Sequence, residues 1–441
     1  MGAAVDILMA GSLAIIPAQD STPPPAESRT MHATAGQMLD LAEQFARRGS
    51  LREAETILSL LSHDPNPDVR NEARFRLAKL LQSQGKTSSA AVLLRQIIDE
   101  KPDAAVVRLQ LAQLLEKLGD VDGALRQVRA AQAGGLPLSV ARLVDRYSEA
   151  LRASRPFGAS FELGLAPDSN INRATRSDTL GTVFGNFDIG NESQAKSGVG
   201  LELRGQAYRR FELRGDTRLL VRLSGSGDLY RASEFNDIAV DLAAGPELRI
   251  GRSRVNVEAG ATQRWFGQKP FIRSVRLATT LAQPLGRRTQ LRLSAAAAIV
   301  DNQLNNREDG EQYWGDASVE RALSATNGVA LTGSLARQSL KDPAYSTTSW
   351  RAGLLGWQDI GRMTLTAAAQ YGRLHADERL VLFPQKRSEQ YYQLSLGATF
   401  RRLTFHGFAP VARFTIERNR SSIAFYDYKR TRSEIGVTRA F

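Results

Sequence analysis

The chain has 441 residues, long enough for two or three domains, and a formal net charge of +12. It contains no cysteine, which excludes disulfides, thiolate metal sites, a cysteine nucleophile and a cysteine-linked lipid anchor. The excess of arginine and lysine favours contact with polyanions, either nucleic acid or the anionic headgroups of a membrane.

Residues 1–29 are predicted to be a signal peptide followed by a linker. The apolar run from Ile7 to Ala18 is too short to cross a bilayer as a helix and suits a signal core better. The signal is imperfect, because Asp6 precedes the run and no basic residue does. A proline-rich linker follows at Ser21 to Ser28. No later stretch is apolar enough for a transmembrane helix.

Residues 30–155 repeat with a period of about 34 to 37 residues. Each repeat has one alanine before a glycine and one alanine after it, and a proline ends the repeat. The positions that carry this pattern are Ala42, Gly49, Ala54, Ala78, Gly85, Ala90, Pro102, Ala112, Gly119 and Ala124. Small residues let two helices approach and glycine makes the turn between them, so the pattern resembles the tetratricopeptide repeat (TPR).

The repeats predict an α-solenoid of helical hairpins, with a final helix from Leu138 to Ala153 that caps the stack. Such a solenoid presents a concave groove for an extended or helical segment of a partner. The alternative is that the repeats serve only as a spacer or as an assembly interface.

Residues 156–441 change to a period of two, with apolar residues alternating with polar ones. In the stretch from Val199 to Ala207, for example, Glu202, Arg204 and Gln206 separate apolar positions. Segments of ten or more residues suit tilted membrane strands better than the shorter strands of a soluble sandwich. Polar residues that the alternation places toward the lumen include Glu202, Arg204, Gln206, Arg222, Glu258 and Arg292.

Short and long connections alternate along this region, as they do in outer-membrane barrels. We predict an antiparallel transmembrane β-barrel of about fourteen strands, near 156–167, 196–209, 217–230, 237–251, 253–266, 272–285, 289–301, 311–323, 329–340, 347–359, 363–376, 388–401, 405–418 and 427–441. An even number of strands brings both ends of the barrel to one side, which predicts that the repeats lie in the periplasm. The whole chain is thus a two-domain α + β protein of the cell outer membrane.

The last strand ends at Phe441, which resembles the C-terminal signal read by the machinery that inserts barrels. Arg439 departs from that signal, and an ordinary strand that happens to end in phenylalanine is the alternative. An outer-membrane location also favours lipid headgroups and lipopolysaccharide as the polyanions that contact the arginine-rich turns, and no nucleic acid is expected.

The sequence predicts neither an enzyme nor a cofactor or metal site. The four histidines are not paired at metal-ligand spacing, and no serine is recognised beside a histidine on a neighbouring strand. Asp168, Asn170 and Asn172 follow the spacing of a calcium loop, but Arg173 stands where that loop needs glycine. Asp168, Asn170 and Asn172 are expected instead to hydrogen-bond their own backbone and shape the first outer loop.

The stretch from Leu165 to Thr175, at the start of the barrel and after the repeats, resembles the surface lipoprotein assembly modifier (Slam) family. Its specific residues are Pro167, Asp168, Asn170, Asn172 and Arg173, with further similarity at Ala195 to Leu201 and at the C-terminal end. The resemblance implies an outer-membrane helper that delivers lipoproteins, or in some cases soluble haem-binding proteins, to the cell surface. It also implies that the repeats engage the client and the barrel provides its passage.

Three other functions stay open at this point. An exopolysaccharide exporter also joins such repeats to a barrel, although it usually carries many more of them. A general porin with an accessory domain and a soluble binding protein are the remaining alternatives.

Overall fold

The computed structural model describes residues 33–133, 157–213, 217–400, 403 and 408–439. The chain divides into two compact units, Met1–Lys86 and Thr87–Phe441, which are described separately. The predicted signal peptide and linker, the predicted capping helix at 138–153 and Phe441 lie outside the described residues.

The described residues of the first unit form three helices, α1 (Ala35–Arg47), α2 (Leu51–Leu61) and α3 (Pro67–Ser83). Helix α1 begins with a capping box, because the Thr34 hydroxyl accepts from the Gln37 amide and the Gln37 side chain accepts from the Thr34 amide. Gly49 has a φ of +84° and makes the turn into α2. Ala42 and Ala54 have no exposed surface, so the predicted small residues lie where the helices pack.

The second unit begins with α4 (Thr87–Glu100), α5 (Ala105–Leu118) and α6 (Val121–Ala133). The predicted small residues Ala90, Ala112 and Ala124 are again completely buried. Two predicted glycines have positive φ, Gly85 (+78°) before α4 and Gly119 (+89°) at the turn between α5 and α6. None of the described helices is long and apolar enough to cross a membrane.

One buried cation joins α5 to α6. The Arg108 guanidinium donates to the Pro102 carbonyl at 2.8 Å and to Gln127 Oε1 at 2.8 Å. Burial lowers the pKa of Arg108 to about 10, because desolvation disfavours the charged form. Pro102 therefore ends its repeat and also supplies a carbonyl oxygen that accepts a hydrogen bond from Arg108.

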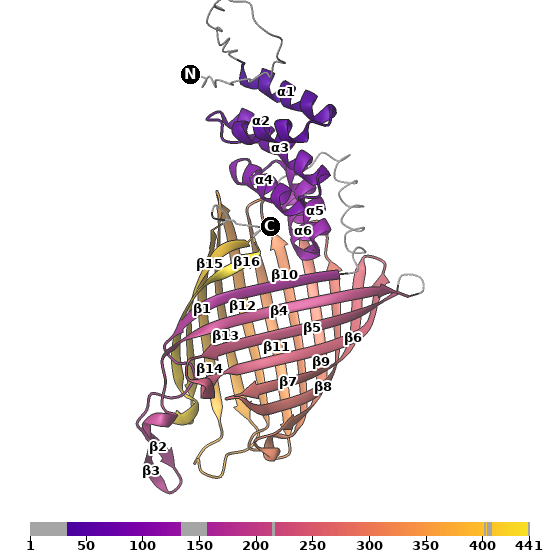
Figure 1. Cartoon of the computed structure of the whole chain (residues 1–441). Coiled ribbons are helices and arrows are strands. Elements are labelled where there is room, and N and C mark those ends of the chain that lie inside the picture. The colour runs from indigo at the N-terminus through magenta and orange to yellow at the C-terminus, as the bar shows by residue number, and fades with distance from the viewer. Residues whose placement is uncertain (1–32, 134–156, 214–216, 401–402, 404–407, 440–441) are drawn as a thin grey trace, which may run out of the picture. The chain divides into compact units, whose positions relative to one another are not determined.

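Fourteen antiparallel strands of the second unit form a closed barrel in the order β1–β16–β15–β14–β13–β12–β11–β10–β9–β8–β7–β6–β5–β4 (Figure 1). Their bounds are β1 (Phe157–Asp168), β4 (Gly198–Glu212), β5 (Thr217–Tyr230), β6 (Asp237–Ile250), β7 (Ser253–Phe266), β8 (Lys269–Pro284), β9 (Thr289–Asn302), β10 (Gly310–Ala322), β11 (Asn327–Leu340), β12 (Thr347–Ile360), β13 (Met363–Ala376), β14 (Ser388–Phe400), β15 (Phe408–Ser421) and β16 (Tyr428–Arg439). The predicted α + β class and the fourteen-stranded barrel are confirmed.

The first outer loop carries structure that the sequence pattern did not predict. A two-stranded sheet, β2 (Thr179–Thr182) and β3 (Gly185–Asp188), lies within it (Figure 1). Each of these strands has four residues, too few for an alternating pattern to be recognised in the sequence. The loop rim also carries short 3₁₀ turns, for example Ser233–Phe235 and Asn306–Glu308.

The alternation along each strand separates an apolar outer face from a polar lumen. On β12, Trp350 and Leu354 are exposed on the outside. Toward the lumen, Glu202 of β4 and Glu258 of β7 are buried. Charged side chains are seldom buried unless they are paired with an opposite charge. A barrel with this pattern meets lipid with one face and encloses polar groups with the other.

The barrel closes where β1 meets β16, and this described strand pair has the fewest aligned residues. Four residue pairs align there, from Leu163–Val437 to Asp168–Arg432, against eleven or more at every other described strand pair of the barrel. Pro167 has no N–H to donate. Gly164 faces Gly436, and a Cβ on Gly436 would lie 2.3 Å from the Leu163 carbonyl oxygen. The two backbones therefore approach closely at a point where the ladder itself is short.

Candidate functional site

Asp168, the last residue of β1, points into the lumen and is completely buried. Its Oδ2 accepts from Arg430 Nη2 at 2.5 Å and Nε at 2.9 Å, and its Oδ1 accepts from the Asn170 amide at 2.9 Å. The carboxylate thus joins the end of β1 to β16 and also starts the turn that follows. Charge-assisted bonds of this kind are about twice as strong as neutral ones.

Arg432 extends this arrangement around the closing junction. It lies 2.6 Å from Glu202 of β4, 2.9 Å from Asp228 of β5 and 3.0 Å from Glu434. We call the set Asp168, Glu202, Asp228, Glu417, Arg430, Arg432 and Glu434 the junction cluster. Most of its side chains are nearly inaccessible, and each of the two arginines has more than one carboxylate partner, among them Glu417 at 3.3 Å from Arg430. Loss of one member would therefore weaken the compensation of a buried charge.

The two asparagines of the Leu165–Thr175 stretch hold the first outer loop in place. Asn170, completely buried, accepts from the Ala174 amide and donates to the carbonyls of Ala174 and Lys429. Asn172 donates to the Gln194 carbonyl at 2.8 Å and accepts from the Lys196 amide at 3.0 Å. These bonds tie the start of the loop to β16 and to the segment that leads into β4.

The remaining residues of the stretch also face structural partners. Arg173 has a φ of +46° and its Nε lies 3.6 Å from Glu417 Oε2. Pro167 aligns with Val199 of β4. Among the residues described, no group of three or more histidines or carboxylates is placed to hold a metal ion.

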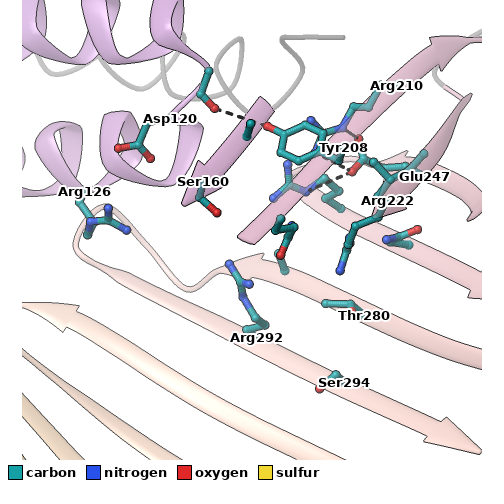
Figure 2. Close-up of a pocket in the computed structure, with 17 residues that line it drawn as sticks. Asp120, Arg126, Ser160, Tyr208, Arg210, Arg222, Glu247, Thr280, Arg292 and Ser294 are labelled. Carbon is teal, nitrogen blue, oxygen red and sulfur yellow. Dashed lines mark hydrogen bonds and ion pairs between the residues drawn. The ribbon is translucent and has the colours of Figure 1, made fainter. Parts of the chain in front are cut away.

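A cavity of about 600 Å³ lies at the end of the lumen that meets α5 and α6 (Figure 2). Five arginines and two carboxylates line it: Arg126 of α6, Arg210 of β4, Arg222 of β5, Arg254 of β7, Arg292 of β9, Asp120 and Glu247. Arg210 makes a bidentate pair with Glu247, with bonds of 2.8 and 3.3 Å. We call this space the arginine cavity.

The helices contact the barrel around the same end. Arg129 of α6 lies 2.5 Å from Glu320 Oε1 and 2.7 Å from Gln290 Oε1. Arg95 of α4 lies 2.7 Å from Asp359, beside the turn between β12 and β13. The Tyr208 hydroxyl donates to the carbonyl of Gly119, the repeat glycine, at 3.4 Å. Sequence reasoning did not find these contacts.

A smaller cavity of about 240 Å³ lies toward the loop rim. It is also basic, and two of its arginines lie over aromatic rings: Arg351 over Tyr391 at 4.8 Å and Arg387 over Tyr426 at 3.8 Å. Both ends of the lumen therefore present arginine.

The lumen positions predicted from alternation occupy two places. Gln206, Arg222 and Arg292 line the arginine cavity. Glu202 belongs to the junction cluster and is also paired with Arg204, while Glu258 lies 3.0 Å from Arg222. The sequence analysis did not identify the lumen-facing cations Arg430 and Arg432. Two arginines two residues apart share one face of a strand, and Ile435 lies on the opposite, outer face, so the alternation could have indicated them.

The expectation that no serine lies beside a histidine on a neighbouring strand is wrong. Ser388 of β14 aligns with His375 of β13, and its Oγ lies 3.2 Å from His375 Nδ1. The strand register brings the two residues together, and the sequence pattern alone does not define that register to the residue.

Asp377 follows β13 and is paired with Arg337. Two hydrogen bonds of 2.5 and 2.6 Å join them, and this hydrogen-bonded cation keeps the pKa of the Asp377 carboxyl below its usual range.

Comparison with known proteins agrees with this architecture. A family model described as surface lipoprotein assembly modifier matches residues 158–441, which is the whole barrel. The chain belongs to the surface lipoprotein assembly modifier family. A tetratricopeptide repeat model matches residues 81–134, which covers α4, α5 and α6.

Curated members of the surface lipoprotein assembly modifier family match most of the chain. Surface lipoprotein assembly modifier 1 of Haemophilus influenzae is 22% identical over 82% of this chain and 76% of its own length. The protein of the same name from Neisseria meningitidis serogroup B is 21% identical over 82% and 74%. A bacterial polysaccharide outer membrane secretin is 13% identical over 64% of this chain and 98% of that one, with a TM-score of 0.33, a likeness too weak to bear on function. As a member of this family, the protein is an outer-membrane β-barrel with tetratricopeptide repeats.

Proposed function

We propose that the repeats engage a lipoprotein or secreted client in the periplasm and that the barrel lumen gives the client passage to the cell surface. One observation carries the proposal: α4 and α6 are ion-paired to the ends of β12 and β10, and a polar cavity of about 600 Å³ lies between the helices and the barrel strands. The two curated relatives are named for assembly of surface lipoproteins. The function we assign is binding and passage rather than catalysis.

The orientation follows from the connections. The rim that meets the helices has tight turns, such as those at Gly251 and Gly361, and the opposite rim carries the long first loop with β2 and β3. Outer-membrane barrels keep their short turns in the periplasm and their long loops outside. We therefore assign the repeats and the arginine cavity to the periplasmic side.

The proposal is tested by deleting the gene and counting surface-exposed, epitope-tagged lipoprotein on intact cells. We expect surface display to fall at least about tenfold while total lipoprotein stays constant, and expression of the full chain to restore it. A chain without residues 30–155 should assemble, shown by heat-modifiable migration on a gel, yet fail to restore display. Unchanged display of all lipoproteins together with loss of secreted polysaccharide would overturn the proposal in favour of polysaccharide export.

The pairing of helix and barrel makes a narrower prediction. Arg129→Glu replaces the cation that lies 2.5 Å from Glu320 by a second carboxylate, so we expect surface display to fall several-fold without loss of the folded barrel. Adding Glu320→Arg to this variant should recover much of the display, because the swap restores opposite charges. Display is measured by flow cytometry, and equal values for the single and double variants would contradict the role of this contact.

A further inference from the structure

One lipid-facing sector of the barrel, on strands β12 to β15 near the rim with the long loops, carries arginines beside aromatic rings. We propose that this sector binds the phosphate groups of lipopolysaccharide in the outer leaflet, through the guanidinium groups of Arg373 and Arg420. The inference rests on the orientation assigned above, which puts this rim outside the cell, and it does not depend on the identity of the client.

The two arginines lie in one row across the sheet. Trp350 of β12 aligns with Arg373 of β13. Gln390 of β14 aligns with Arg373 on one side and with Arg420 of β15 on the other. Residues that align across antiparallel strands point to the same face of the sheet. Because Trp350 is exposed on the outside of the barrel, Arg373 and Arg420 also face outward, and both are exposed.

A cluster of aromatic rings defines the depth of this row in the membrane. The Trp350 ring packs edge-on against Tyr371, with 5.5 Å between centroids, and Tyr371 lies 5.1 Å from Tyr392. Tryptophan and tyrosine gather at the headgroup level of membrane proteins. Toward the bilayer centre the same outer face carries the exposed side chains of Leu354 and Leu394. The row of arginines therefore lies at the level of lipid phosphates rather than of hydrocarbon.

The aromatic side chains position the two arginines without neutralising them. Arg373 Nε donates to the Tyr371 hydroxyl oxygen at 2.8 Å, and the Arg420 guanidinium lies over the Tyr392 ring, 5.9 Å from its centroid. Neither arginine pairs with a carboxylate within the described part of the chain. A phosphate from the surrounding lipid supplies the counter-ion, and hydrogen bonds between arginine and phosphate are of the strong, charge-assisted kind.

Other outward-facing positions near the same rim lack this property. Arg337 of β11 is already neutralised, because its two terminal nitrogens bind Asp377 at 2.5 and 2.6 Å. On β10 a similar arrangement has the opposite charge, since the exposed Tyr313 hydroxyl donates to the exposed Glu311 at 2.5 Å. Anionic lipid is attracted to β13–β15 and repelled at β10, so we expect it to bind at one side of the barrel rather than all around it.

The spacing of the arginines selects the class of lipid. Arg373 and Arg420 lie two strands apart, which is about 10 Å across a sheet. Lipopolysaccharide carries several phosphates on a sugar scaffold and can engage both cations at once, whereas a glycerophospholipid carries a single phosphate. A single phosphate would satisfy one of the two arginines and leave the other without a counter-ion.

The test adds purified bisphosphorylated lipid A to the full-length protein in detergent and counts bound lipid by native mass spectrometry. We expect one saturable site. Arg373→Gln with Arg420→Gln should weaken the affinity by about tenfold or more, because charge-assisted contacts to phosphate are lost. Lipid A stripped of its phosphates and phosphatidylglycerol should both bind less tightly than the bisphosphorylated lipid. Heat-modifiable migration verifies that each variant is folded.

The matched control, Arg209→Gln with Arg273→Gln, removes the same charge from exposed, outward positions elsewhere. Arg209 lies near the periplasmic end of β4, over the Phe211 ring, and Arg273 of β8 aligns with Asp301. This variant should change the affinity less than about twofold, because charges far from the site are screened.

Three results would overturn the assigned site. They are equal weakening by the two double variants, equal affinity for lipid A with and without its phosphates, and equal affinity for phosphatidylglycerol. The assay contains no client, so any of these results leaves the proposed function standing. A protein that binds lipid A as expected, but whose deletion leaves lipoprotein display unchanged, would instead reject the proposed function alone.

Discussion

Asp168→Asn is expected to lower the free energy of unfolding of the barrel by about 2 kcal/mol, because buried Arg430 loses its two charge-assisted hydrogen bonds to the carboxylate and keeps only Glu417, at 3.3 Å. The lost carboxylate is completely buried and is the 2.5 Å partner of Arg430, with Arg432 3.9 Å away. The midpoint of urea unfolding in lipid vesicles, read from tryptophan fluorescence, measures the effect.

Asp316→Asn provides the control for this change. Asp316 also sits on a lumen-facing position, but it is exposed and accepts a bond from Ser294 at 3.2 Å. Substitutions at such positions usually change stability by about 0.5 kcal/mol or less. Equal unfolding midpoints for the two variants would show that the junction cluster contributes nothing special to the barrel.

Gly436→Val is expected to impair closure of the barrel, with a loss of about 3 kcal/mol or complete failure to assemble. A Cβ at this position would lie 2.3 Å from the Leu163 carbonyl oxygen and 2.8 Å from the Gly164 Cα, and backbone atoms cannot move aside as a flexible side chain can. The fraction of heat-modifiable protein in isolated outer membranes measures the result.

Gly356→Val tests whether any added bulk on a strand has this effect. A Cβ on Gly356 of β12 meets no atom within 4 Å, so the variant should assemble like the parent chain. Normal assembly of Gly436→Val would mean that β1 and β16 do not approach as closely as the structure shows.

The features that the sequence predicted are those carried by local patterns. Strand bounds came from alternation and from the lengths of connections, and most agree with the structure within three residues. The helical turns came from glycines whose positive φ, as at Gly49 and Gly119, leaves few other residues suitable. Both kinds of signal depend on residues that are neighbours in the chain.

The partners of the charged residues could not be predicted in this way. Asp168 and Arg430 meet only after the barrel has closed, and Ser388 meets His375 only in one strand register. A slip of one residue would turn each side chain to the other face. The contacts of Arg95 and Arg129 depend in turn on where the helices meet strands far along the chain.

The closing junction has a consequence for the order in which the barrel forms. Every other described strand of the barrel pairs with the next barrel strand along the chain, so each of these pairings closes a loop far shorter than the whole barrel. The β1–β16 pairing instead joins Asp168 to Arg432, and the entropy of closing so long a loop is on the order of 5 kcal/mol. The sheet is therefore expected to grow hairpin by hairpin and to close last. The junction cluster lies at this last pairing, which carries the entropic penalty. Until β1 and β16 pair, the nascent sheet has two open edges, β1 and the most recently added strand.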